Sequence, residues 1–140
     1  MKFTSKLLYA AKPASPRASY LAIQLDSASK QEILSMVTPK YKKIDCDHIT
    51  VEFDTPTPEL QEKYTNASLE VVGYQFGEGA DCLVISVNGS IKRPDGGLFH
   101  VTLSLKGGHK ANESNAVLKQ QGYNIIIPFP IHGEIALLPK

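Results

Sequence analysis

The sequence predicts an α+β fold built mostly from antiparallel sheets. Three observations support this prediction: β-rich runs outnumber helix-like segments, turns suited to hairpins separate neighbouring runs, and a strand-plus-helix order occurs twice along the chain. The repeated order indicates two similar lobes. A chain of 140 residues is most simply one domain, so we expect a single unit over residues 1–140, with residues 1–18 as an extended lead-in.

The expected strands are short runs rich in β-branched and aromatic residues, bounded by Gly, Pro, Asn or Asp. They are Phe3–Tyr9, Ser19–Asp26, Asp47–Asp54, Leu69–Phe76, Asp81–Asn88, the run that contains His100, Tyr123–Ile127 and Ile131–Leu138. Gly77-Glu78-Gly79 predicts a hairpin, and turns are expected at Asn88-Gly89 and Pro94-Asp95-Gly96-Gly97. Pro128-Phe129-Pro130 is expected to separate the last two strands.

Capping and stop signals predict about three helices. The spacing Ser29-x-x-Glu32 is that of a capping box, and Pro39 ends the apolar stripe that follows it. Thr57-Pro58-Glu59 places a cap and a first-turn proline at the start of a second helix, which runs to about residue 66. Asn112 or Ser114 caps a third helix, which ends at Gly122.

The composition is ordinary for a soluble globular protein, with 42% hydrophobic and 21% charged residues. No apolar run approaches the length that spans a membrane, and the N-terminus lacks the apolar segment of a signal peptide. Cys46 and Cys82 are expected to be small buried hydrophobes in a reducing compartment, since one possible bridge is no disulfide framework. We therefore expect a cytoplasmic protein that does not contact membranes.

The balance of charge argues against long nucleic acid as a partner. Fifteen Lys and Arg residues are offset by fourteen Asp and Glu residues, which leaves a net charge of +1. Proteins that hold long nucleic acids usually carry a basic field, because several phosphates must be neutralised. A ligand with about one to three phosphates fits this balance better than a polymer does.

Two copies of one pattern carry the chemistry: Asp47-His48-Ile49-Thr50-Val51 and Phe99-His100-Val101-Thr102-Leu103. Side chains alternate along a strand, so the His and Thr of each copy share one face while the residue between them points into the core. Two facing strands of this kind offer two imidazoles and two hydroxyls. Such a set can bind a phosphate and move protons on both sides of it, so we expect His48, Thr50, His100 and Thr102 to be catalytic.

Other chemistries are less well supported. Nothing near the two histidines completes a set of metal ligands, so no metal and no other cofactor is expected. The sequence has no nucleophile elbow, although strand alternation places the Cys46 thiol on the side of His48. The glycines at 73, 77 and 79 are not followed by a helix and so form no phosphate loop. His109 and His132 lack a partner motif and are expected at solvated positions.

Paired His-x-Thr motifs on strand-like runs resemble the two-histidine (2H) phosphoesterases, which include LigT-like RNA ligases and cyclic phosphodiesterases. The resemblance covers residues 19–138, nearly the whole chain. It implies a bilobal, pseudo-two-fold α+β fold, with mostly antiparallel sheets facing a central cleft, helices outside, and one His-x-Thr from each lobe. It also implies metal-independent catalysis in which one histidine acts as base and the other as acid, with His48 weakly favoured as the base.

A narrower resemblance concerns the phage anti-CBASS phosphodiesterases, small single-domain enzymes that destroy the cyclic oligonucleotides bacteria use as immune messengers. The matching segments are Gly73-Tyr74, Val84–Gly89, Arg93–Gly96, Phe99–Thr102, Lys110 and Glu113–Asn115. It implies cleavage of 3′–5′ linkages in cyclic di- or trinucleotides, in the host cytoplasm if the protein is phage-encoded. An RNA-repair or tRNA-processing enzyme acting on 2′,3′-cyclic ends, and a non-catalytic nucleotide sponge, remain alternatives.

Substrate contacts are expected from aromatic and polar residues around the two motifs. Tyr74 stands where that group has a stacking aromatic residue, typically tryptophan, and this chain has no tryptophan. Tyr20 is a second stacking candidate, Lys110 could meet a phosphate, and Glu134 could accept a hydrogen bond from a base amine. Arg93 is expected to hold its turn together with Asp95. The sequence leaves base preference, ring size and oligomeric state open.

Overall fold

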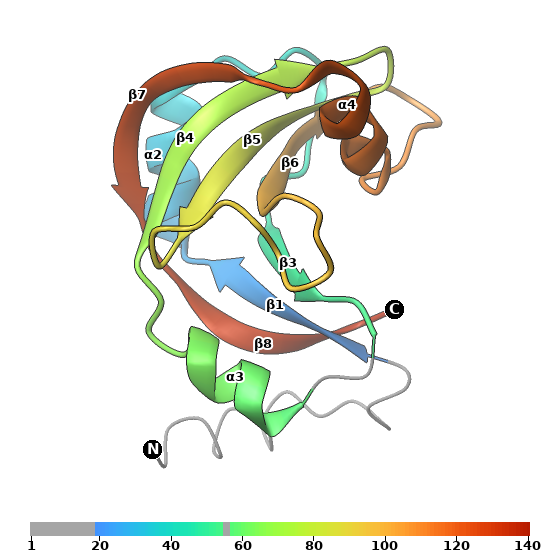
Figure 1. Ribbon diagram of the computed structural model, residues 1–140. Coiled ribbons are helices and arrows are strands. Elements are labelled where there is room, and N and C mark those ends of the chain that lie inside the picture. The colour runs from blue at the N-terminus through green and yellow to red at the C-terminus, as the bar shows by residue number, and fades with distance from the viewer. Residues whose placement is uncertain (1–18, 55–56) are drawn as a thin grey trace.

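The computed structural model describes residues 19–54 and 57–140 (Figure 1). Its strands are β1 Ser19–Leu25, β2 Lys43–Ile44, β3 His48–Glu52, β4 Leu69–Phe76, β5 Ala80–Val87, β6 His100–Leu105, β7 Asn124–Ile131 and β8 Gly133–Pro139. Its helices are α2 Ser27–Met36, α3 Pro58–Tyr64 and α4 Glu113–Gln121. The strand expected at Phe3–Tyr9 lies outside the described residues.

The strands form two antiparallel sheets. One has three strands in the order β3-β1-β8, and the other has five in the order β2-β6-β5-β4-β7. Figure 1 shows the five-stranded sheet above the three-stranded sheet, with β3 and β6 near each other where the sheets approach. The predicted α+β class with mostly antiparallel sheet is therefore confirmed.

Several element predictions are confirmed. The hairpin of β4 and β5 turns at 77–79, where the Gly77 amide donates to the Ala80 carbonyl at 2.9 Å. Helix α3 is capped by Thr57, whose side chain accepts from the Leu60 amide at 3.2 Å, and Pro58 occupies its first turn. Gly122 ends α4 with a φ of 68°, a conformation that glycine adopts without strain.

The predicted capping box at Ser29-x-x-Glu32 is wrong. Helix α2 is capped three residues earlier, by Asp26, whose carboxylate accepts from the Ser29 amide at 2.7 Å. The Ser29 side chain is instead buried in the first turn, where its hydroxyl accepts from the His132 amide at 2.7 Å. The cap of α4 also differs from expectation: Asn112 is the cap residue, but its side chain makes no capping hydrogen bond.

The predicted break at Pro128-Phe129-Pro130 is also wrong, because β7 runs through it as one strand. β7 lies at the edge of the five-stranded sheet, where a proline without an N–H is tolerated. The pairing with β4 shifts register between Val71 and Gly73. The expected strand Tyr123–Ile127 therefore extends to Ile131, and the break before the last strand falls at His132.

One hydrophobic core receives side chains from both sheets. Ile49 and Val51 of β3, and Val101 and Leu103 of β6, are fully buried in it. Because strand side chains alternate, the His-x-Thr residues on these strands point to the opposite face in each sheet. A smaller cluster around Cys82, Val84 and Leu118 packs α4 against β5. None of the helices within residues 19–54 and 57–140 is long and apolar enough to cross a membrane.

Candidate active site

The segment before β3 passes from one sheet to the other and brings the two motifs together. The Cys46 amide donates to the Thr102 carbonyl at 2.8 Å, which extends the pairing of β2 with β6. The backbone carbonyl of the next residue, Asp47, accepts from the Leu25 amide at 3.0 Å, at the end of β1 in the other sheet. Cys46 has a φ of 43°, and this left-handed residue turns the chain between the sheets. His48 therefore begins β3 beside the strand that carries Thr102.

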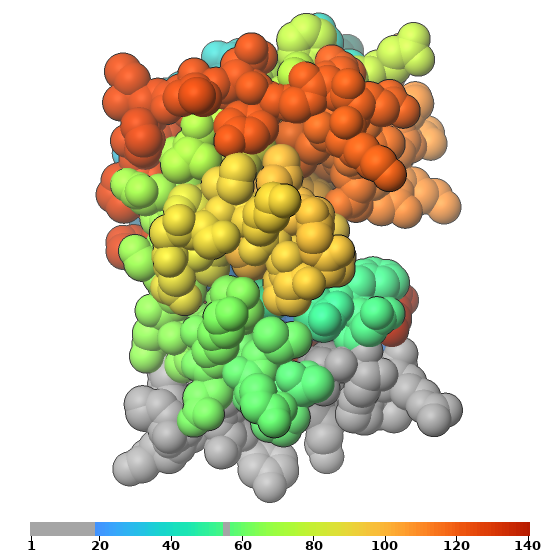
Figure 2. Space-filling view, viewed as in Figure 1, coloured from blue at the N-terminus to red at the C-terminus, as the bar shows by residue number. Residues whose placement is uncertain are grey.

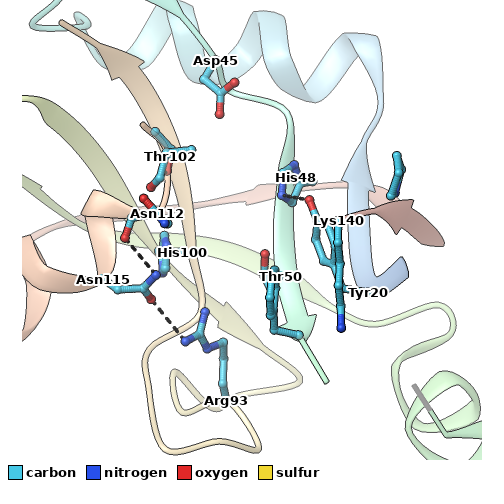
Figure 3. Close-up of a pocket in the computed structure, with 13 residues that line it drawn as sticks. Tyr20, Asp45, His48, Thr50, Arg93, His100, Thr102, Asn112, Asn115 and Lys140 are labelled. Carbon is cyan, nitrogen blue, oxygen red and sulfur yellow. Dashed lines mark hydrogen bonds between the residues drawn. The ribbon is translucent and has the colours of Figure 1, made fainter. Parts of the chain in front are cut away.

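His48, Thr50, His100 and Thr102 all line one cavity of about 310 Å³. Figure 3 shows His48 and Thr50 on one side of this cavity, from β3, and His100 and Thr102 on the other, from β6. In Figure 2 the surface is notched on the right, between the orange segment after β6 and the turquoise end of β3. The structure thus brings the four residues predicted to be catalytic into one space.

His100 is held in one tautomer by the backbone. Its Nδ1 lies 2.8 Å from the Leu98 carbonyl, which can only accept, so Nδ1 carries the proton and the neutral ring has its lone pair on Nε2. The residue is only 9% exposed. Burial lowers the pKa of His100, the hydrogen bond to Leu98 opposes this, and the Arg93 guanidinium lowers the pKa further.

His48 is held at both ring nitrogens. Its Nδ1 lies 3.1 Å from Asp47 Oδ2 and its Nε2 lies 3.0 Å from the Tyr20 hydroxyl. Burial opposes ionisation of Asp47, but hydrogen bonds from His48 and Lys30 outweigh it and lower the pKa of Asp47. The ionised carboxylate accepts from Nδ1–H, so Nε2 is the nitrogen that can serve a substrate, at the position the Tyr20 hydroxyl now occupies.

A further carboxylate, Asp45, lines the cavity near His48. Burial raises the pKa of Asp45, and the charge of His48 opposes that rise. Asp45 and Asp47 thus both lie within electrostatic reach of His48, whereas Arg93 lies within reach of His100. Two carboxylates therefore lie near His48, whereas His100 lies near the Arg93–Asp95 ion pair, whose two charges act on its pKa in opposite directions.

The two threonines differ in their hydrogen bonding. Thr102 Oγ1 donates to the Ala111 carbonyl at 3.1 Å and lies 2.8 Å from the Ser114 hydroxyl. Its proton is therefore engaged with the segment that leads into α4, and donation to a ligand requires rotation of the hydroxyl. Thr50 is half-buried, and Figure 3 shows its hydroxyl directed into the cavity.

The open rim of the cavity carries aromatic rings and a cation. The rings of Tyr20 and His48 are 5.7 Å apart, and those of Tyr20 and Phe53 are 5.3 Å apart. Phe53 is 54% exposed, and the Lys140 ammonium lies 5.1 Å from its ring centroid. Of the two predicted stacking residues, Tyr20 is therefore at the site, next to an aromatic residue that strand patterning did not single out.

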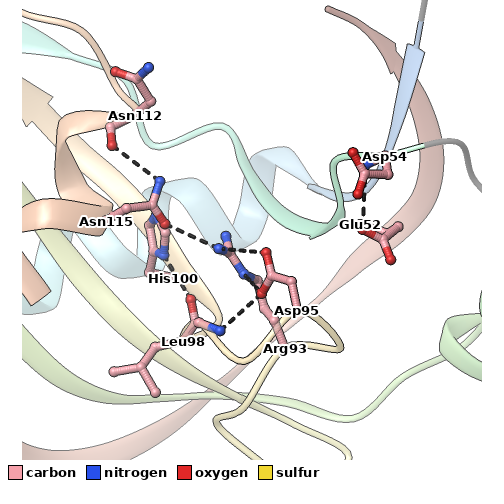
Figure 4. Close-up of polar contacts among 9 residues, drawn as sticks. Glu52, Asp54, Arg93, Asp95, Leu98, His100, Asn112 and Asn115 are labelled. Atoms are coloured by element: carbon pink, nitrogen blue, oxygen red, sulfur yellow. Dashed lines mark hydrogen bonds and ion pairs between the residues drawn. The ribbon is translucent and has the colours of Figure 1, made fainter. Parts of the chain in front are cut away.

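Arg93 both holds its turn, as expected, and faces the cavity. Its Nε and Nη2 donate to the two carboxylate oxygens of Asp95, each at 3.1 Å. Nη2 also donates to Asn115 Oδ1 at 3.2 Å, which ties the turn to α4 (Figure 4). These contacts fix the guanidinium beside His100, so Arg93 belongs to the site as well as to the turn.

Three of the predicted substrate-binding residues lie away from the cavity. The Tyr74 hydroxyl donates to Asp81 Oδ2 at 2.8 Å on the five-stranded sheet, where burial and this bond raise its pKa. Lys110 donates its amide to Glu113 at 3.0 Å and does not line the cavity. Glu134 pairs across Gln24, two strands away from His48, and lines a different hollow.

The cysteine thiols do not reach the cavity either. The expectation that Cys46 shares the side of His48 fails, because its left-handed backbone breaks the strand alternation and its side chain joins the core. Burial raises the pKa of Cys46 to about 11 and that of Cys82 to about 12, so both thiols stay protonated. His109 bonds Glu113 at 2.7 Å, away from both motifs.

Apart from Tyr20, the lining residues that come from outside the two motifs were assigned no cavity role from the sequence; Arg93 was expected only to hold its turn, and the others follow. They are Asp45, Phe53, Ala111, Asn112, Asn115, Pro139 and Lys140. Asp45 and Phe53 flank the first motif closely, so proximity in sequence was the one signal that pointed to them. Over residues 19–54 and 57–140, no group of three or more His, Cys, Asp or Glu side chains could hold a metal ion. No family model, curated protein or solved structure matches this chain.

Proposed function

We propose that this protein is a metal-independent phosphodiesterase of the two-histidine type. The observation that carries the proposal is the shared cavity, in which one imidazole and one threonine from each sheet face a common space. Two titratable groups around one phosphate suit a reaction that removes one proton and delivers another, whereas simple binding does not need them. In this proposal the two sheets correspond to the two lobes of that superfamily.

The proposed reaction starts from a ribose 2′-OH next to a 3′–5′ linkage. One histidine takes the proton of this hydroxyl while its oxygen attacks phosphorus, and the other protonates the departing 5′-oxygen. The P–O2′ bond forms as the P–O5′ bond breaks, so the products are a 2′,3′-cyclic phosphate and a free 5′-OH. The attacking hydroxyl is already held beside phosphorus, which is a large entropic advantage. Thr50 and Thr102 would donate to the non-bridging oxygens.

The surroundings of the two rings favour His100 as the base and His48 as the acid. The neutral form of His100 is favoured by burial, and its Nε2 presents a lone pair. The acid role then falls to His48, which can donate from Nε2 because its Nδ1 is bound to Asp47 at 3.1 Å. This assignment reverses the weak expectation drawn from the family resemblance.

The proposed substrates are cyclic di- or trinucleotides with 3′–5′ linkages, the messengers that phage anti-CBASS enzymes destroy. The sequence resemblance supports this class, and besides the second motif two of its segments contribute Arg93 and Asn115 to the cavity. A third, Tyr74, lies elsewhere, so stacking would fall to Tyr20 and Phe53 at the rim. The small net charge of +1 agrees with a ligand of few phosphates.

The test is to incubate the protein in EDTA with 3′–5′ cyclic GMP–AMP and, separately, with an oligonucleotide that ends in a 2′,3′-cyclic phosphate. We expect the cyclic dinucleotide to be cleaved, and His48→Ala and His100→Ala to lower kcat by at least about 100-fold. His132→Ala is the matched control, because His132 is exposed and outside the cavity.

Each other outcome would contradict a particular part of the proposal. Loss of activity in EDTA contradicts the two-histidine mechanism, and full activity in either alanine variant contradicts the site. Processing of the oligonucleotide end alone points to RNA repair. Binding of the cyclic dinucleotide without turnover points to a sponge.

A further inference from the structure

A second hollow of about 480 Å³ adjoins the candidate active site on the side of His100. Arg93, His100 and Asn115 line both spaces. The other walls come from the turn after Arg93 and from α4: Asp95, Gly96, Gly97, Leu98, Leu118 and Lys119. Figure 4 shows the hydrogen bond between Arg93 and Asn115 beside His100, whose own ring is bonded to the Leu98 carbonyl. A cavity of this size, with two leucines among charged and polar side chains, has the volume of a site for a small ligand.

The lining of this second hollow suits a nucleoside. Leu98 and Leu118 provide apolar surface of the kind a flat base can pack against, and Lys119 adds a cation at its edge. Nε and Nη2 of Arg93 are bound to Asp95 and Asn115, while Nη1 makes no hydrogen bond within the described part of the chain. This free N–H group, fixed in place by its neighbours, can donate to a base or a phosphate oxygen.

We propose that the second hollow is the subsite for the nucleoside whose 2′-OH attacks phosphorus. This inference rests on the proposed function and names which half of the substrate lies where. Because His100 Nε2 takes the 2′-OH proton, the ribose that carries this hydroxyl must lie on the His100 side of the phosphate, and its base enters the adjoining hollow. The departing nucleoside then lies on the His48 side, towards the rings of Tyr20 and Phe53.

The test compares two esters that share one leaving group: adenosine 3′-(4-nitrophenyl phosphate) and the same ester of ribose without a base. Lys119→Glu is the test variant, since Lys119 is exposed and lines only the second hollow. We expect KM for the adenosine ester to rise by about five- to tenfold, with kcat and the ribose ester changed by less than about twofold. Lys92→Glu, an equal change of charge at an exposed residue outside the hollow, should leave both esters unchanged.

An equal rise in KM for the two esters, or the same rise with Lys92→Glu, would overturn the subsite. The effect would then come from the change in net charge and not from a contact with the base. An unchanged KM for the adenosine ester would overturn it as well. Binding of adenosine 3′-monophosphate, measured by calorimetry, separates this inference from the proposed function. If the wild-type protein cleaves neither ester yet binds this nucleotide more weakly after Lys119→Glu, the function fails and the subsite stands.

Discussion

His48 and His100 both carry a proton on Nδ1, but different partners hold it there. A backbone carbonyl fixes the ring of His100 without adding charge, whereas the carboxylate of Asp47 holds the ring of His48. Two chemically identical side chains can in this way take opposite roles near neutral pH. The difference depends on Asp47, the residue before His48, and on Leu98, two residues before His100. Both partners are therefore close in sequence to their histidines.

The first prediction concerns Asp47→Asn and the pH dependence of kcat/KM. Activity on the acid side requires neutral His100, and burial lowers the pKa of His100, so the wild-type rate should persist below the ordinary histidine pKa of about 6.5. Asp47→Asn removes the carboxylate that holds the ring of His48 but does not touch His100, so kcat/KM should fall while the acid limb stays in place.

A profile measured from about pH 4.5 to pH 9.5 checks this expectation, and Glu134→Gln is the control, because Glu134 lies two strands from His48. Movement of the acid limb in Asp47→Asn would mean that His48 is the base after all.

At the scale of elements, Cys46 determines how β3 follows β2. It is the residue at which the chain passes from the five-stranded sheet to the three-stranded sheet. A non-glycine residue in the left-handed region costs about 1–2 kcal/mol relative to the right-handed backbone. Here the strained residue lies two positions before His48, fully in the core. The strain is therefore located at the turn that brings the strand with the first His-x-Thr motif beside the strand with the second.

The second prediction compares alanine and glycine at the two buried cysteines. In an ordinary strand, a glycine variant is less stable than the alanine variant by roughly 0.5–1 kcal/mol. We expect this order at Cys82 in β5, so that Cys82→Gly is less stable than Cys82→Ala. At Cys46 the order should reverse, with Cys46→Gly more stable than Cys46→Ala by about 1 kcal/mol, because only glycine relieves the positive φ. Urea denaturation of the four variants measures the free energies of unfolding. The same order at both sites would contradict the strained turn.

Elements with local signals were predictable, and elements decided by their neighbours were not. Thr57 and Pro58 were sufficient to predict the start of α3, because the cap and the first-turn proline depend only on residues near in sequence. β7 could not be read as one strand, because whether Pro128 and Pro130 break it depends on its place at the edge of the sheet. The start of α2 was misplaced for a similar reason: the Ser29 hydroxyl is used by the distant His132 amide, which leaves the cap to Asp26.

At the scale of the whole molecule, the candidate site exists only where the two sheets approach each other. Strand alternation was enough to predict that each His and Thr pair shares a face, because that depends on neighbours in sequence. It could not show that Asn115 and Lys140 reach the same cavity, since these residues come from a helix and from the last strand's end. For the same reason Tyr74 was misjudged: its ring belongs to the five-stranded sheet, where Asp81 holds the hydroxyl.

The third prediction follows from dividing acid and base between two sheets. If His48 and His100 act on one phosphate in a single concerted step, removing either one disables the same transition state. Each alanine variant should then lose about 100- to 10,000-fold in kcat, and the double variant should lose little more than the worse single one. Single-turnover rates with cyclic GMP–AMP measure this, and urea denaturation of each variant checks that both sheets remain folded. Losses that multiply would instead mean that each sheet contributes to its own step, and that the two histidines do not work as one unit.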